Sequence, residues 1–439
     1  MNIQSNSKLF SISPSAFFTI SAFILTLKLF YIFYVHPEEA YRGYSYINHG
    51  ILFDLISYLL CLLPALFMPD NIKKPSDISL VILFVFIYIP SVSIGGYVIS
   101  DSLDTFLFFC SLFIGIASLK IFSDFFTKYF SMRFPMNFPN QVDYKVFNLL
   151  VLGLFGYSLF SLSQSWSGFF NIQTVAELYA QRVEDRSNQG SLSGYLYSII
   201  KSLLLILAVY KLFVSKKNIS LLLAALVILI ICLDLLMSQF IRSHLYIAFF
   251  LLAIGYLIKK NSFNLYHLPL MALLICFFSF FLDFMFRLDF FSHTFPRRLF
   301  VVPGIISGFY YNYISDVGTF YNAESASRFL DFNNVTYLIG TAVQPDQFKM
   351  NMSTSMWSIS YAYFGGIGIL ITSLISGLIL SILNSERKYS FFPSMIAIFI
   401  GLTWSEQSLW SSMLSSGIIF CLVYFYVYSN SNSINWKKL

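Results

Sequence analysis

Long apolar stretches alternate with short polar segments along the whole chain. A helix that spans a membrane needs about 20 largely apolar residues. The apolar runs here are continuous and do not alternate with period two, which favours helices over the strands of a barrel. The pattern predicts about twelve spans, near residues 14–35, 46–67, 78–98, 105–127, 146–165, 194–214, 220–237, 245–258, 267–287, 357–383, 392–404 and 410–429. We therefore predict an all-α, polytopic membrane protein in which residues 1–439 form a single transmembrane helical domain.

Lysine placement predicts the orientation of these spans. Positive charge falls in every second gap, at Lys8, Lys73, Lys74, Lys128, Lys216, Lys217, Lys259, Lys260, Arg387, Lys388, Lys437 and Lys438. The positive-inside rule makes these gaps cytoplasmic and places both termini on the cytoplasmic side. The opposite side receives residues 36–45, 99–104, 166–193, 238–244, 288–356 and 405–409, of which 166–193 and 288–356 are long.

Composition excludes several classes of protein. Hydrophobic residues make up 57% of the chain and charged residues 11%, whereas soluble proteins carry roughly 25% charged residues. The net charge of +6 is spread over the gaps between spans, so it reflects topology and does not predict nucleic-acid binding. All five cysteines fall within predicted spans, so neither disulfides nor a zinc site is indicated.

Arginine follows a different distribution from lysine. Only Lys349 among seventeen lysines lies in an outer segment, whereas eight of ten arginines map to the outer side: Arg42, Arg182, Arg186, Arg242, Arg287, Arg297, Arg298 and Arg328. The planar guanidinium group is suited to phosphate or carboxylate. Two interpretations remain open: the outer arginines bind an anionic substrate, or they pair with nearby acids such as Glu177, Glu184 and Asp185.

The two long outer segments differ in pattern. In 166–193, Thr174 and Glu177 form a capping box, and the apolar spacing that follows predicts a short amphipathic helix on the membrane surface. Arg182 and Arg186 are one turn apart on this helix. Segment 288–356 is predicted to be a long loop with arginines near its start.

Absent motifs narrow the chemistry further. The sequence contains no phosphate-binding loop, no His-Glu-x-x-His metal motif and no Asp-x-Asp pair. We therefore expect no cofactor and no metal, and ATP-driven transport and nucleotide-sugar chemistry are disfavoured. Within the spans, Lys28 and Asp54 lie at similar depth, which predicts a structural ion pair.

Several short motifs resemble those of O-antigen polymerases of the Wzy type, a family of oligosaccharide repeat-unit polymerases. Arg297 is followed, after ten residues, by Gly308, as in the Arg-X10-Gly pattern of that family; Arg182 and Gly194 are one residue too far apart for it. Residues 238–242, ending in Arg242, resemble a short arginine turn of polymerases and O-antigen ligases. Residues 351–368 are similar to a segment that re-enters the membrane. Twelve spans with two long outer loops also match.

The resemblance implies a glycosyltransferase of the bacterial inner (cytoplasmic) membrane. Such enzymes polymerise undecaprenyl-pyrophosphate-linked oligosaccharide repeat units into O-antigen or related surface polysaccharide at the periplasmic face, within membrane lipids and with a chain-length regulator as a further partner. The departing pyrophosphate requires cationic donors and the attacking hydroxyl a general base. Candidate pyrophosphate donors are Arg182, Arg186, Arg242, Arg297 and Arg298. Candidate bases are Glu184, Asp185, Asp316, His293 and His244, and candidate sugar-stacking residues are Tyr310, Tyr311 and Tyr313.

Two alternatives remain at this stage. An O-antigen ligase would perform the same chemistry with lipid A-core as the acceptor. A lipid-linked oligosaccharide flippase would instead carry charged residues along a central path and has little need of the long segment 288–356.

Overall fold

The computed structural model describes residues 12–133, 192–215, 224–229, 242–287, 289–317, 352–384 and 391–431, together with a few positions between 153 and 343. The regular structure of these residues is helical, and their one strand-type pairing is an isolated antiparallel bridge between Asn71 and Asn264. The predicted all-α class is therefore confirmed for the described part of the chain.

Five helices in the described residues are long and apolar enough to cross a membrane: Pro14–Glu39, Pro75–Val98, Ser102–Tyr129, His267–Phe286 and Met356–Leu383. Each coincides with a predicted span, as expected of a multi-pass membrane protein. Shorter apolar helices cover Ile51–Leu66, Tyr246–Lys259 and Phe391–Glu406. The count of twelve spans and the side assigned to each loop stay predictions.

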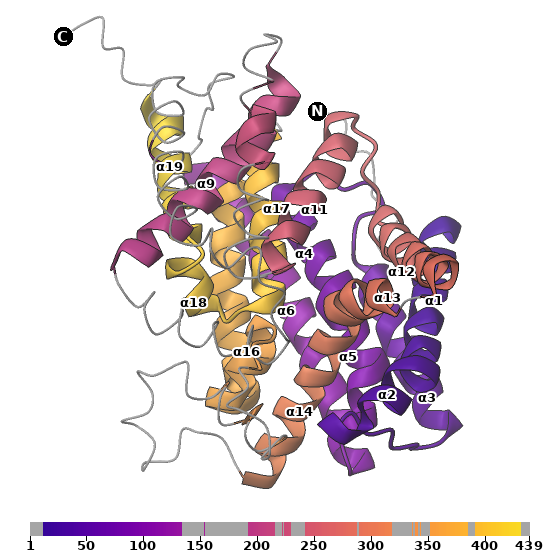
Figure 1. Cartoon of the computed structure of the whole chain (residues 1–439). Coiled ribbons are helices and arrows are strands. Elements are labelled where there is room, and N and C mark those ends of the chain that lie inside the picture. The colour runs from indigo at the N-terminus through magenta and orange to yellow at the C-terminus, as the bar shows by residue number, and fades with distance from the viewer. Residues whose placement is uncertain are drawn as a thin grey trace, which may run out of the picture. The chain divides into compact units, whose positions relative to one another are not determined.

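Several of these helices change geometry along their length, and their α-helical parts are labelled in Figure 1. The first consists of α1 (Pro14–Phe30), the π-helical η1 (Tyr31–Val35) and α2 (His36–Glu39), and the second of α4 (Pro75–Leu83), η4 (Phe84–Tyr88), α5 (Ile89–Ile94) and η5 (Gly95–Val98). The remaining helices used below are α3 (Ile51–Leu62), α6 (Ser102–Arg133), α9 (Leu192–Val214), α11 (Arg242–Lys259), α12 (His267–Phe286), α13 (Phe290–Thr294), η6 (Arg297–Val301), α14 (Val302–Val317), α16 (Met356–Leu383), α17 (Phe391–Glu406) and α19 (Ile418–Ser431).

The chain divides into two compact units, each described by itself; the prediction of a single transmembrane domain stays a prediction. The first comprises residues 1–132, 263–384 and 401–409, and the second residues 133–262, 385–400 and 410–439. In the second unit, α9 packs against α11 and α19, and the Tyr210 ring stacks on Phe391 with centroids 5.9 Å apart. The predicted site residues that the structure describes with their side chains all lie in the first unit.

The first unit is built around the helix Pro75–Val98, whose apolar window is entirely buried. Helix α14 packs along it at very short range. A Cβ atom added to Gly308 would lie 2.1 Å from the carbonyl oxygen of Gly95, and one added to Gly304 would lie 2.8 Å from that of Pro90. Small residues permit such close approach between membrane helices. Gly308, the glycine of the Arg-X10-Gly pattern, therefore lies in a helix–helix contact.

Helix α16 folds back on itself at Gly365, whose φ of 63° and ψ of −149° belong to a region that only glycine occupies readily. The Trp357 indole donates to Ser373 Oγ at 3.0 Å, and the Thr372 hydroxyl to Ser360 Oγ at 2.5 Å. In a straight helix, residues 16 positions apart are about 24 Å apart. Instead of the one continuous span predicted for 357–383, α16 is therefore a hairpin with a short and a long arm. Such a hairpin suits the re-entrant segment expected within 351–368.

The first part of segment 288–356 is helical, although a loop was predicted. It forms α13, η6 and α14, and the Phe300 ring lies between Phe23 and Phe86 at centroid distances of 5.1 and 5.4 Å. Phe23 and Phe86 are near the middle of two predicted spans. The apolar run after Arg298 is buried. It was not predicted as a span because Pro296, the arginine pair and Pro303 interrupt the apolar sequence before it reaches about 20 residues.

The predicted ion pair between Lys28 and Asp54 is confirmed. Lys28 Nζ lies 2.6 Å from Asp54 Oδ1 and also donates to Ser57 Oγ at 2.8 Å. The Tyr97 hydroxyl donates to the same carboxylate oxygen at 2.8 Å. This network joins α1, α3 and η5, and it satisfies a charge that would otherwise be costly at this depth.

Candidate functional site: a charged cluster between α2 and α13–η6

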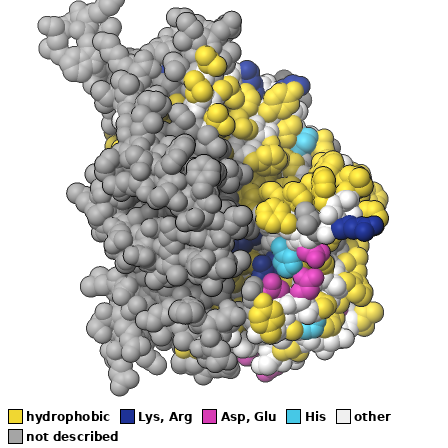
Figure 2. Space-filling view, in the orientation of Figure 1, with side chains coloured by type: hydrophobic (Ala, Val, Ile, Leu, Met, Phe, Trp, Pro, Cys, Tyr) yellow, Lys and Arg dark blue, Asp and Glu magenta, His cyan; other side chains and the backbone are white. Residues whose placement is uncertain are grey.

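Two acids on α2 meet two basic side chains on α13 and η6. Glu38 Oε2 lies 2.7 Å from His293 Nε2, and Glu39 Oε1 lies 3.0 Å from Arg297 Nη2. The two acids are consecutive at the end of α2, and the two basic residues are four positions apart, about one helical turn. Both basic side chains can therefore reach the end of α2. We call Glu38, Glu39, His293 and Arg297 the charged cluster. Figure 2 shows histidine, acidic and basic side chains gathered on a face that is otherwise largely hydrophobic.

The position of α13 is fixed from the preceding helix. Helix α12 ends at Phe286 and is followed by its capping residue Arg287, which has a left-handed backbone with φ of 52°. The Asp283 carboxylate then accepts hydrogen bonds from the backbone N–H groups of Phe291 at 2.8 Å and Ser292 at 2.6 Å. It thereby caps the free N–H groups of a helix start. Asp283, one turn before Arg287, thus holds α13 in place.

A tyrosine of η1 fixes the other side of α13. The Tyr34 hydroxyl lies 2.7 Å from Ser292 Oγ, and its ring centroid lies 5.4 Å from that of His293. Since Ser292 is fully buried, this contact ties α13 to the end of the first span. His293 is therefore held by Tyr34 and Glu38, both from the segment that follows α1.

The two ion pairs differ in exposure. The side chains of Arg297 and Glu39 are only 14% and 6% exposed, whereas those of His293 and Glu38 are 30% and 41% exposed. The Arg297 guanidinium also lies over the Tyr44 ring, 5.8 Å from its centroid. A buried ion pair is costly to break, so Arg297–Glu39 joins α2 firmly to η6. The His293–Glu38 pair remains accessible.

Arg297 still has unused hydrogen-bonding capacity. Its Nε is buried and has no hydrogen-bond partner among the described residues. The neighbouring Arg298 is exposed and, within the same part of the chain, has no ion-pair partner. For Arg297 the structure supports pairing with an acid; for Arg298 it leaves the guanidinium group accessible to an anion.

The tyrosines predicted to stack against sugars lie mainly in the protein interior. Tyr310 is fully buried and its hydroxyl donates to the Met352 carbonyl at 2.9 Å. Tyr311 stacks on Tyr361 with centroids 4.7 Å apart, and half-buried Tyr313 packs against the core. Tyr310 and Tyr311 therefore offer no exposed face to a sugar in this conformation.

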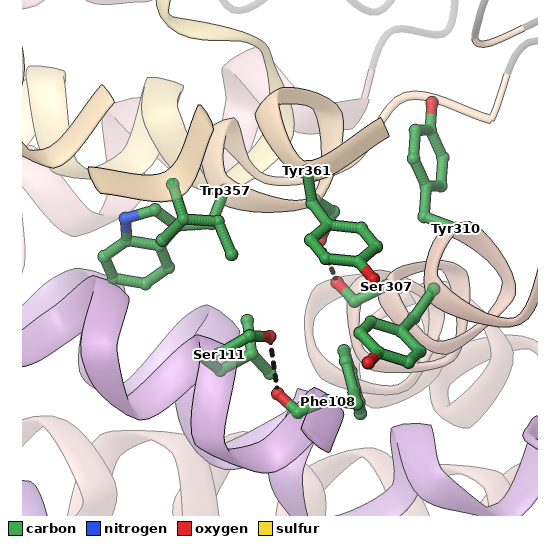
Figure 3. A pocket seen from close by; sticks show the side chains of 10 residues that line it. Phe108, Ser111, Ser307, Tyr310, Trp357 and Tyr361 are labelled. Atoms are coloured by element: carbon green, nitrogen blue, oxygen red, sulfur yellow. Dashed lines mark hydrogen bonds between the residues drawn. The ribbon is translucent and has the colours of Figure 1, made fainter. Parts of the chain in front are cut away.

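Tyr310 and Tyr311 line a cavity of about 10 Å³ between α6, α14 and the short arm of α16, which suffices for about one water molecule. Its other lining residues include Ser111, Ser307, Trp357 and Tyr361 (Figure 3). In this view the Tyr310 hydroxyl points away from the other lining side chains. The cavity is too small for a sugar.

The remaining candidates are described in part or not at all. Arg182, Glu184, Asp185 and Arg186 lie outside the described residues, as does the amphipathic helix predicted in 166–193. Arg242 begins α11 and Asp316 lies in the last turn of α14, but their side chains are not among those described, nor is that of His244. The described residues contain no group of three or more metal-ligating side chains.

Glu38 and Glu39 are functional candidates that the sequence pattern alone did not predict. A signal was present: they are consecutive acids at the end of a predicted span, in a segment assigned to the same side as 288–356. What sequence could not supply was the pairing of segments more than 250 residues apart.

A scan of protein-family models, a search of curated proteins and a search of solved structures each found no match for this chain. The likeness to O-antigen polymerases therefore rests on the motifs and architecture described above.

Proposed function

We propose that this protein is a membrane glycosyltransferase that extends a glycan carried on a lipid pyrophosphate, as O-antigen polymerases do. The observation that carries the proposal is that the half-exposed His293 and, four residues later, Arg297 pair with consecutive glutamates of α2, and that the exposed Arg298 follows Arg297 directly. A base and fixed cations next to one another are what transfer from a diphosphate donor requires. The architecture of long apolar helices with a re-entrant hairpin agrees with a lipid-linked substrate.

In the proposed reaction, His293 accepts the proton of a sugar hydroxyl on the acceptor unit. The hydroxyl oxygen attacks the anomeric carbon of the donor glycan, and the bond from that carbon to the pyrophosphate oxygen breaks. The lipid pyrophosphate leaves with the bonding electron pair, and Arg298 stabilises its charge. The pyrophosphate-binding roles of Arg182, Arg186 and Arg242 stay predictions from the sequence.

Arg297 is given a double role in this proposal. Its pair with Glu39 holds α2 against η6. Its free Nε and positive charge contribute to the positive electrostatic potential that stabilises the diphosphate. Arginine suits this role because its five N–H donors can serve two partners at once.

The proposal can be tested with purified protein and a lipid-pyrophosphate-linked repeat unit. Wild-type protein should convert the single unit into a ladder of longer glycans on a gel. His293→Ala and Arg298→Gln should lose the ladder, whereas Arg287→Gln, which removes an exposed arginine outside the cluster, should keep it.

The alternatives give different products in the same system. Transfer of glycan to lipid A-core without a ladder would identify a ligase. Movement of labelled lipid across a vesicle membrane without any extension would identify a flippase, and the polymerase proposal would be abandoned.

A further inference from the structure

The half-exposed pair of the charged cluster fixes one nitrogen of the candidate base. Glu38 Oε2 lies 2.7 Å from His293 Nε2. A carboxylate accepts hydrogen bonds and does not donate them when ionised, so Nε2 must carry the proton of this contact. In a neutral imidazole the other nitrogen, Nδ1, then bears the lone pair.

We propose that Glu38 is a positioning residue that makes Nδ1 of His293 the nitrogen that takes the proton from the acceptor hydroxyl. This inference rests on the proposed function and adds to it a residue and an atom. When Nδ1 receives the proton, the imidazole becomes a cation, and the adjacent Glu38 carboxylate stabilises it.

The surroundings of His293 agree with a fixed orientation. Tyr34 lies against its ring, and Asp283 holds the backbone of α13 one and two residues before it. With the backbone fixed by Asp283 and one ring nitrogen fixed by Glu38, the imidazole has little freedom to rotate. A base whose orientation is set in advance loses less entropy at the moment of reaction.

The exposures of the two acids separate their roles. Glu39 is 6% exposed and pairs with a buried guanidinium, so its removal should act through folding. Glu38 is 41% exposed and pairs with a half-exposed histidine, so its removal should act on the reaction. Consecutive glutamates on α2 thus provide an internal comparison.

The first test is kinetic. Glu38→Gln should lower the maximal rate of glycan extension about 10- to 100-fold, which is part of the ~10²–10⁴-fold that a general base contributes, and leave KM for the donor unchanged. Asp289→Asn, which removes an exposed acid next to α13, should behave as wild type. Glu38→Ala should regain activity in added formate, because a small carboxylate can reach the exposed position, and Glu39→Ala should not. An unchanged maximal rate in Glu38→Gln, or a loss of rate that follows loss of folded protein, would overturn the proposal.

The second test does not depend on catalysis. Nitrogen-15 NMR of histidine-labelled protein, with the signal assigned by its loss in His293→Gln, reports which ring nitrogen carries the proton in neutral His293. We expect the proton on Nε2 in wild type and a mixture of tautomers in Glu38→Gln. A proton on Nδ1 in wild type would refute the assignment even if the protein polymerises glycans. The expected tautomer in a protein that extends no glycan would instead count against the proposed function alone.

Discussion

The buried pair between Arg297 and Glu39 makes a substitution of either residue a test of folding as well as of activity. The two charges are 3.0 Å apart, with side chains 14% and 6% exposed. Removing one member leaves the other as an uncompensated charge, which costs about 3–5 kcal/mol. Replacing both by apolar residues of similar size removes that penalty and is often neutral. Arg297→Met and Glu39→Leu should each be strongly destabilising, and the double variant should be close to wild type.

The assay is thermal unfolding of the purified protein in detergent, followed by glycan extension with equal amounts of folded protein. Both single variants should melt at lower temperature. The double variant should melt near the wild-type temperature but form no long glycans, because it lacks the Arg297 charge. The double variant therefore separates the structural role of Arg297 from its proposed chemical role.

A second buried pair provides a matched control. Lys120 Nζ lies 2.8 Å from Asp77 Oδ1, with side chains 15% and 6% exposed, and 3.0 Å from Asp124 Oδ2. Lys120→Met should destabilise the protein to a similar extent, but its folded fraction should extend glycans normally.

Two results would refute this reasoning. Single variants of Arg297 or Glu39 that lose less than about 1 kcal/mol would show that the pair is not the buried anchor described here, since even the lower end of the expected cost is about 3 kcal/mol. A double variant that forms glycans of normal length would show that the Arg297 charge has no part in the reaction.

Three further substitutions test the fold. Gly308→Ala should lower the free energy of unfolding by about 1–3 kcal/mol or more, as overpacking does, because the new Cβ would clash with backbone. The control is Gly366→Ala, since no atom lies within 4 Å of its Cβ position. Equal melting temperatures of the two variants would contradict the close contact at Gly308. Gly365→Ala should cost about 1–3 kcal/mol through backbone strain, and wild-type stability there would argue against the hairpin. Lys28→Met should lower the melting temperature by leaving Asp54 without its cation, and Lys28→Arg should lower it less.

Much of the fold could be predicted from hydrophobic pattern, because an apolar run of about 20 residues has few alternatives to a membrane helix. The predicted spans 78–98 and 267–287 differ from the observed helices Pro75–Val98 and His267–Phe286 by at most three residues at either end. The ion pair of Lys28 and Asp54 could also be predicted, because each charge has few possible partners at its depth.

The pattern failed where apolar runs are short or broken. The run that begins at Leu299 is too short to be counted as a span, yet it is buried against the central helix. Helix α16 has the length of one span, but a single glycine reverses its direction. Hydropathy reports how much apolar surface a segment carries and does not report the direction in which the chain travels.

The candidate site could be predicted only in part, for a related reason. The sequence predicted that His293 and Arg297 lie on the outer side, as a candidate base and a candidate pyrophosphate donor, but it did not identify the acids with which they pair. The structure supplies Glu38 and Glu39 from a segment more than 250 residues earlier. Pairing over such a separation depends on how α1 packs against α12 and how Tyr34 of η1 contacts α13, which local patterns do not encode.

The buried helix Pro75–Val98 explains how ion pairs and non-helical backbone can exist among helices that are apolar enough to span a membrane. Non-helical backbone and ion pairs are tolerated within a membrane only where protein shields them from lipid. Helix Pro75–Val98 contributes no surface to lipid, so the elements packed around it, including α14, have an interior side on which Gly308 and the hairpin can be accommodated. The charged cluster lies where α14 begins, at the edge of that interior. A site there has a protein scaffold on one side, and half-exposed His293 and Glu38 leave it accessible on the other, which is the combination that the proposed glycan transfer requires.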